Sequence, residues 1–286
     1  VSGTSISFGS EVVFESDSTN YISATYDSTN GKVVIAYQDQ GNSSYGTAIV
    51  GTVSGTSISF GTAVVFESAS STYISATYDS TNGKVVIACK DGGNSNYGTA
   101  IVGTVSGTSI SFGSPVVFES AQANHISAAY DSTNNKVVIA YRDDGNSSIG
   151  TVIVGTVSGT SISFGTAVVF ESGITNWISS TYDSTNGKVV IAYQDQGNSN
   201  YGTAIVISST STNLTANNFI GFSDAAYSDG DTATIQIEGS VDDAQSGLTT
   251  ARKHYVQNDG TLSTTAGNPS VVAGTAISGT KIIIET

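Results

Sequence analysis

Four positions spaced 52 residues apart carry the side chains with the clearest binding chemistry. They hold rings in every case: Tyr21, Tyr73, His125 and Trp177. Two further sets repeat at the same interval, long polar or basic side chains and then carboxylates: Gln38, Lys90, Arg142 and Gln194, followed by Asp39, Asp91, Asp143 and Asp195. Ring faces that stack on apolar surfaces, beside amides and carboxylates that bind hydroxyls, suit a neutral sugar. We expect these residues to form a ligand-binding surface.

The same residues also have a structural interpretation. Each of the four aspartates stands two residues before a glycine, and an Asp in that place commonly caps its own turn. Each ring stands where it could cover the apolar inner side of a strand. The sequence leaves both interpretations open, although turn capping is the stronger one for the aspartates.

Catalytic and metal chemistry is poorly represented in the chain. A sialidase-like site needs three clustered arginines, but Arg142 and Arg252 are the only two and lie in different parts of the sequence. The only histidines, His125 and His254, are equally far apart, which argues against a His-based triad or a zinc site. The carboxylates of Asp27 and Asp39 recur in every copy, whereas a carboxylate-pair active site is a single constellation. We expect no enzyme activity, no metal and no cofactor.

These positions recur because the chain contains four copies of one unit, at residues 1–52, 53–104, 105–156 and 157–208. Each copy opens with VSGTSISFG and continues through VVFES, a YDSTN turn, KVVIA and a GNS turn. A Ser/Thr-rich linker is expected at residues 209–218. Residues 219–286 do not share the repeat and predict a small all-β domain, a barrel or a sandwich.

The repeat predicts four antiparallel strands per blade, at residues 21–26, 32–38, 45–53 and 57–67 for the first blade, because turn sequences separate these β-rich segments. Residues 33–36 are apolar throughout, which is typical of a strand buried on both faces. Four-stranded units that cover one another predict an all-β protein with a four-bladed β-propeller. Residues 5–15 are expected to complete the fourth blade and close the ring. Alternatively, the four units belong to a longer array and a ring of more blades.

Differences between the copies are concentrated in two windows. Of the 52 aligned columns 18 vary, and ten of these lie in the windows that unit 1 carries at residues 17–21 and 37–45. In an up-and-down blade both windows emerge on the same face, and loops on a rigid scaffold commonly bind ligands. Drift of exposed loops is the alternative, but the DSTN and VSGTS turns of the other face barely vary. The variable face is therefore predicted to be a recognition surface.

The charge balance excludes several partners. Nine basic residues stand against 23 acidic ones, a net charge of -14, which argues against nucleic acid and anionic membrane surfaces. No apolar segment approaches the roughly 18 residues of a membrane span, so no membrane insertion is expected. The absence of Met suggests a processed product or a fragment, and Cys89 has no cysteine with which to pair.

The C-terminal segment GLTTARKHYVQNDGTLSTT, followed by VVAGTAISGTKIII, resembles a small β domain near the C-termini of bacteriophage tail-fibre and other structural proteins. The repeat, with VVIAYQDQGNSNYGTAIVGTVSGTSISFGT, is similar to repeats in proteins of marine phages and bacteria. The resemblance implies a non-enzymatic, extracellular virion protein of the tail fibre or tail tip. Its propeller would bind a host-cell glycan or other receptor. The C-terminal domain would contact other tail proteins or form a homo-oligomer.

Two other functions remain open from the sequence. The first is a secreted bacterial lectin or adhesin with the same propeller. The second is a purely architectural virion or filament subunit whose variable face contacts only proteins.

Overall fold

The computed structural model describes residues 6–207, 219, 221–223, 232, 234–257, 261–266 and 270–285. Contacts divide the chain into two compact parts, Val1–Ser209 and Thr210–Thr286. The described residues form strands and one short 3-10 turn, η1 (Asp144–Asn146), so the predicted all-β class is confirmed. The linker expected at residues 209–218 lies outside the described residues. The boundary between the two compact parts falls at the start of this expected linker.

Each of the four units contributes three long antiparallel strands. In unit 1 these are β1 (Thr19–Asp27), β2 (Lys32–Asp39) and β3 (Tyr45–Ser54). The equivalent strands are β5 (Val64–Asp79), β6 (Lys84–Asp91) and β7 (Tyr97–Ser106) in unit 2, β9 (Val116–Asp131), β10 (Lys136–Asp143) and β11 (Ile149–Ser158) in unit 3, and β13 (Val168–Asp183), β14 (Lys188–Asp195) and β15 (Tyr201–Ile207) in unit 4. Short strands start units 2 to 4: β4 (Ser57–Phe60), β8 (Ser109–Phe112) and β12 (Ser161–Phe164).

The fourth strand of the predicted blade is divided in the structure. Residues 57–67 were expected to form one strand, but β4 ends at Phe60, and the chain resumes at Val64 in a strand that continues to Asp79. A side chain at Gly61 would overlap the carbonyl oxygen of Thr108, so the backbone passes against the next unit where the strand breaks. The predicted loop between the fourth strand and the next unit is therefore part of β5.

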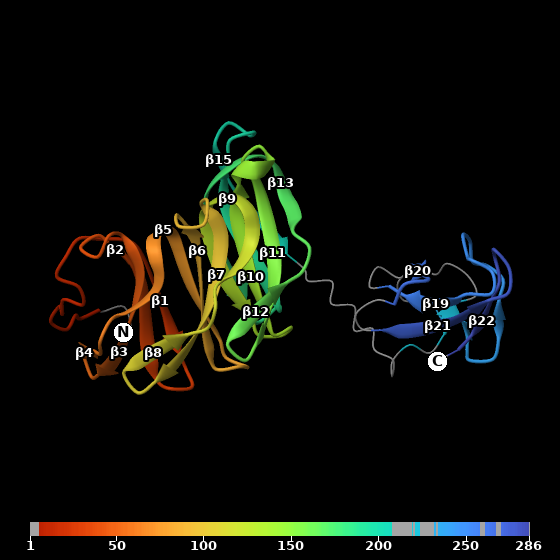
Figure 1. Ribbon diagram of the computed structural model, residues 1–286, viewed down its shortest axis with the longest axis horizontal. Helices are drawn as coiled ribbons and strands as arrows, with labels where there is room; N and C mark the ends of the chain where they lie inside the picture. The colour runs from red at the N-terminus through yellow and green to blue at the C-terminus, as the bar shows by residue number, and fades with distance from the viewer. Residues whose placement is uncertain are drawn as a thin grey trace. The chain divides into compact units, whose positions relative to one another are not determined.

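This long strand joins consecutive sheets. The first half of β5 pairs with β3, as at Thr47 with Val65, and its second half pairs with β6, as at Thr77 with Val86. The same arrangement repeats at β9 and β13, so the strands follow one another in series (Figure 1) in the order β1-β2-β3-β5-β6-β7-β9-β10-β11-β13-β14-β15.

Successive units pack face to face through apolar side chains. Unit 1 presents Val34, Ala48 and Val50, which cluster with Ile74 and Ile87 of unit 2. Similar clusters join units 2 and 3 and units 3 and 4. In unit 2 the central strand is fully buried on both sides, which confirms the prediction drawn from its apolar sequence; the residues are Val85, Val86, Ile87 and Ala88.

The expected ring closure is corrected by the structure. Within the described residues, β1 and β15 pair on one side only, and residues 6–15 form no strand. Phe14 instead packs on Tyr37 of its own unit, with 5.2 Å between ring centroids, and the Tyr37 hydroxyl donates to Glu15 Oε2 at 3.1 Å. Units 3 and 4 make the same internal contacts, so the segment is held by its own unit. The four blade-like sheets form an open array.

The C-terminal part contains a five-stranded antiparallel sheet in the order β18-β22-β21-β19-β20. Its strands are β18 (Val241–Asp242), β19 (Lys253–Val256), β20 (Leu262–Ser263), β21 (Val271–Ala276) and β22 (Ile282–Ile284), and a separate pair is formed by β16 (Phe222–Ser223) and β17 (Ile235–Gln236). Leu248, Val271 and Ile282 lie in its core. The apolar strand β22 is paired on both sides, with β18 and β21. In the described part the sheet ends at β18 and β20 and forms no closed barrel.

Candidate functional site

The four ring-bearing positions lie at a β-bulge in the first long strand of each unit. The pairing of β1 with β2 shifts between Asn20 and Ser23, and Tyr21 occupies the bulge. Its φ angle is 49°, and those of Tyr73, His125 and Trp177 are 51°, 49° and 52°. A positive φ is unusual for bulky side chains and generally carries strain. All four rings are therefore placed by the same strained backbone feature.

The rings contact one another across the unit boundaries. Their centroids are 5.3 Å apart between Tyr21 and Tyr73, 5.1 Å between Tyr73 and His125, and 5.0 Å between His125 and Trp177. The first two pairs are tilted, with 50° and 54° between their planes, and His125 meets Trp177 edge to face at 68°, a favourable ring geometry. Trp177, at one end, is 72% exposed. We call Tyr21, Tyr73, His125 and Trp177 the aromatic ladder.

A second set of contacts runs beside this ladder. The amide Nε2 of Gln38 lies 3.3 Å from Ser70 Oγ of unit 2. Lys90 Nζ donates to Asn124 Oδ1 of unit 3 at 3.1 Å, and Lys90 Nζ also lies 5.1 Å from the centre of the Tyr73 ring. Arg142 and Gln194 hold the equivalent positions. We call Gln38, Lys90, Arg142 and Gln194, with Asn124 and Asn176, the polar strip.

Asp144 organises the centre of the polar strip. Its Oδ1 accepts from Arg142 Nε at 2.7 Å, and its Oδ2 accepts from the side-chain amide of Asn124. Arg142 Nη1 also donates to Asn176 Oδ1 of unit 4 at 2.6 Å. Sequence reasoning did not single out Asp144, although it lies in the second variable window, where the other units have Gln40, Gly92 and Gln196.

Burial and neighbouring charges alter the titration of this surface. Burial lowers the pKa of His125, and the cations of Arg142 and Lys90 lower it further, so the ring favours its neutral form. Burial also lowers the pKa of the Lys90 ammonium. The pKa of the Tyr73 hydroxyl is raised, first by burial and then by Tyr21. Both the His125 imidazole and the Tyr73 hydroxyl are therefore shifted towards their uncharged forms.

The four aspartates proposed as ligand groups have another role. Asp91 Oδ1 accepts from the backbone amides of Gly93 and Asn94, and Asp143 Oδ1 accepts from those of Gly145 and Asn146. Asp39 and Asp195 each cap one amide in the same way. All four are buried. The structure thus favours the turn-capping interpretation, and these carboxylates bind the backbone of their own turns.

The two variable windows adjoin, as the blade geometry predicts. Gln40 N donates to Ser18 O at 3.0 Å, and Gly92 N donates to Ser70 O at 2.8 Å. The first window is a bulged strand rather than a loop, because it belongs to β5 and its equivalents. Variation between the copies is therefore concentrated where the ladder and the polar strip lie.

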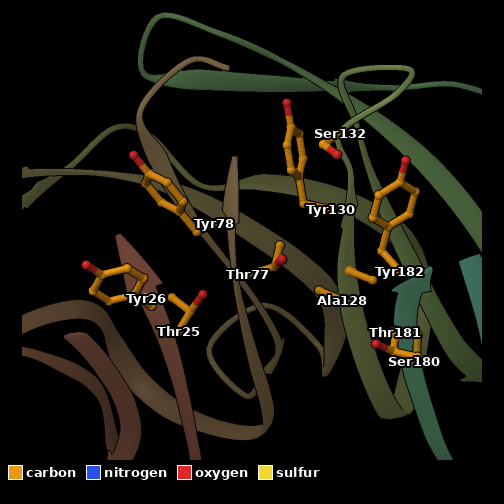
Figure 2. A pocket seen from close by; sticks show the side chains of 11 residues that line it. Thr25, Tyr26, Thr77, Tyr78, Ala128, Tyr130, Ser132, Ser180, Thr181 and Tyr182 are labelled. Carbon is orange, nitrogen blue, oxygen red and sulfur yellow. The ribbon is translucent and has the colours of Figure 1, made fainter. Parts of the chain in front are cut away.

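A hollow of about 420 Å³ lies at the other end of the same strands, near the DSTN turns. Figure 2 shows the tyrosine, serine and threonine side chains around it, and the hydroxyl groups of Tyr78, Tyr130 and Tyr182 point to the same side. These tyrosines hold neighbouring units together: the Tyr78 hydroxyl donates to Thr29 Oγ1 at 2.6 Å. This hollow was not predicted from the sequence, although the YDSTN segment, which is the same in all four units, was an available signal.

No protein-family model matches the chain, and no curated protein matches it. Among solved structures, the SapL1 lectin in complex with alpha methyl fucoside is similar, with 16% sequence identity and a TM-score of 0.42. The match covers 66% of this chain and 64% of that lectin, so the chain spans less than two thirds of its length. In the described part of the chain, no helix is long and apolar enough to cross a membrane, and no group of three acidic, His or Cys residues could hold a metal ion.

Proposed function

We propose that this protein recognises a neutral glycan along the aromatic ladder and the polar strip. One observation carries the proposal: a ring occupies a strained backbone position in all four units, while the kind of ring changes between Tyr, His and Trp. Positive φ at a bulky residue costs on the order of 1–3 kcal/mol. A Gly or Asn would form the same bulge at lower cost. The bulge itself does not require a ring, so we attribute the four rings to the contacts that their side chains make.

The surroundings of the rings suit a sugar. Trp177 presents most of its surface to solvent, and ring faces stack on the apolar faces of sugars. Asn176 and Gln194 are half-buried, and their amides supply both donors and acceptors for hydroxyl groups. The Arg142 guanidinium is paired with Asp144, so the positive charge at the centre of the strip is already neutralised. With a net charge of -14, the protein favours neutral over anionic glycans.

The proposed setting is a phage tail fibre or tail tip, with the glycan on the host surface and the C-terminal domain as the attachment to the virion. Support comes from the resemblance of GLTTARKHYVQNDGTL and the following segment to tail-protein domains. The proposed role is non-enzymatic, because the two arginines are too far apart in the sequence for a sialidase-like site and the two histidines for a His-based triad. A secreted bacterial lectin or adhesin is the second candidate, since the same binding surface would serve it.

The test is binding of free oligosaccharides, selected on a glycan array and measured by calorimetry. Trp177→Ala and Tyr21→Ala should each weaken binding at least tenfold. Tyr26→Ala is the matched control, because Tyr26 lies on the same strand as Tyr21 but lines the hollow at the other end. Loss of binding in Tyr26→Ala alone would move the site to the hollow. Absence of binding to any neutral glycan and to intact bacterial cells would refute the proposal and favour an architectural subunit.

The location of the protein on a phage tail is tested by a separate experiment from its glycan binding. Antibody labelling of purified virions should place the protein on the tail if the phage setting holds. Recovery of the protein from bacterial culture medium or the cell surface, without virions, would favour the adhesin.

A further inference from the structure

The last unit exposes a face that the other units bury. Val206 on β15 is 60% exposed, whereas its equivalents Val50 and Val102 are 0% exposed. Ala204 is likewise exposed, and its equivalent Ala48 is fully buried. In the earlier units this face lies against the following unit, where Val50 joins the cluster that contains Ile74 and Tyr78. Unit 4 has the same apolar face with nothing packed on it among the described residues.

The first unit exposes the complementary face. Tyr26 is 58% exposed, whereas its equivalent Tyr78 is 9% exposed and packs against unit 1. Ile22 is also exposed, and its equivalents Ile74 and Ile126 are buried. At every internal boundary these residues cover the preceding unit. The two ends of the array are therefore the two halves of one repeated joint.

The polar contacts of the joint are left incomplete in the same way. The Tyr78 hydroxyl donates to Thr29 Oγ1 of the preceding unit, and Tyr130 donates to Thr81 Oγ1 at 2.7 Å. Across the part of the chain that the structure describes, the Tyr26 hydroxyl and the Thr185 hydroxyl, which occupy the donor and acceptor positions of the next joint, make no such bond.

Backbone pairing is also incomplete at both ends. Within the array, Ala48 of β3 pairs with Val64 of β5. The equivalent positions at the ends are Ala204 on β15 and Val12, and residues 6–15 are not in a strand. An exposed strand edge readily pairs with another chain.

We propose that copies of this chain associate head to tail, with the unit 4 face around Val206 packed on the unit 1 face around Tyr26 of a second copy. A second copy is the occupant because it presents the surface that already fits this face three times within the chain. The joint would bring Tyr26 to Thr185 and Val12 to Ala204. The two faces differ, so the contact is heterologous, and it builds a closed ring or a filament.

The test is sedimentation velocity of the full chain over a range of concentrations. The parent should form assemblies larger than the monomer. Val206→Lys and Tyr26→Lys should each abolish this association, since either one places a charge in an apolar joint. Val117→Lys is the matched control, because Val117 is also exposed but lies on β9 inside the array. This variant should associate to the same extent as the parent.

Mixing the two variants tests the head-to-tail geometry. Each variant keeps one intact end, so a mixture should form a species of higher mass than either variant alone, and should stop at a pair. A parent that is monomeric at all concentrations would overturn the proposal. So would unchanged association of both variants, which would place the contact in the C-terminal domain, or two variants that lose association and show no gain on mixing. Circular dichroism of each variant separates these outcomes from unfolding.

Discussion

The His125 ring meets the Trp177 indole across the boundary of units 3 and 4, with 5.0 Å between their centroids and 68° between their planes. The contact joins a titratable ring to the most exposed ring of the ladder. Because the polar strip runs beside it, the charge of His125 is linked to Arg142 and Lys90. The ladder and the strip therefore behave as one surface rather than as four separate sites.

The first prediction concerns the titration of His125. Burial, Arg142 and Lys90 lower its pKa below the usual 6.5, so an NMR titration should give a midpoint below 6.5. In Arg142→Gln the midpoint should rise, because a repelling cation is removed while Asp144 remains. A midpoint that does not change in this variant would contradict the electrostatic link between the two residues.

The same shift predicts how stability depends on pH. A lowered pKa in the folded state means that the unfolded chain binds the proton more readily. The contribution of His125 to stability is therefore complete above pH 6.5 and is lost as the pH falls towards the folded-state pKa. Urea unfolding should show a steeper loss between pH 7 and pH 5 in the parent than in His125→Phe. Equal pH dependence of stability in the two proteins would show that folding does not shift the pKa of His125.

The second prediction separates stability from binding at the bulge. Replacing Trp177 by Gly removes a bulky side chain at a φ of 52°, which should leave the protein equally stable or more stable by about 1 kcal/mol. Glycan affinity should fall at least tenfold in the same variant. Thermal unfolding and calorimetry measure the two effects. A clear loss of stability would mean that the ring serves packing instead.

The third prediction concerns Cys89, which replaces a buried tyrosine. The equivalent Tyr141 donates its hydroxyl to Glu119 Oε2 at 2.9 Å. Among the described residues no hydroxyl donates to Glu67 beside Cys89, and burial raises the pKa of Glu67. Pro115 lines the space next to Cys89. We expect Cys89→Tyr combined with Pro115→Ala to raise the free energy of unfolding by about 1–3 kcal/mol, since it adds a hydrogen bond to a charged group.

The reverse substitution provides the control for Cys89. Tyr141→Cys should lower stability by at least as much in urea denaturation, because it also removes a buried ring. If both variants matched the parent, the hydroxyl contact to the carboxylate would contribute nothing.

The fourth prediction compares two tyrosines at equivalent positions. Tyr78→Phe removes the hydroxyl that donates to Thr29, and it should cost about 1 kcal/mol of unfolding free energy. Tyr26→Phe should cost nothing in the dilute monomer, because its hydroxyl has no partner among the described residues. Guanidinium denaturation at low protein concentration checks both. Equal losses would show that the effect does not come from the joint between units.

Some of this protein could be derived from the sequence alone. The 52-residue repeat, the turns and the strand buried on both faces follow from local patterns, because turn residues and apolar runs act over a few positions. The comparison of copies also located the ladder positions Tyr21 and Trp177. The capping role of Asp39 was the stronger of two interpretations, since an Asx turn closes within its own loop.

Only the tertiary structure decided how those elements combine. The break at Gly61 depends on Thr108 of the next unit, and the contact between His125 and Trp177 joins residues that the sequence separates by a whole unit. The open ends at β1 and β15 likewise depend on how each unit is turned relative to its neighbour. Side-chain packing between the sheets sets the rotation from one unit to the next. The repeat in the sequence shows which residues recur, but it does not give this rotation.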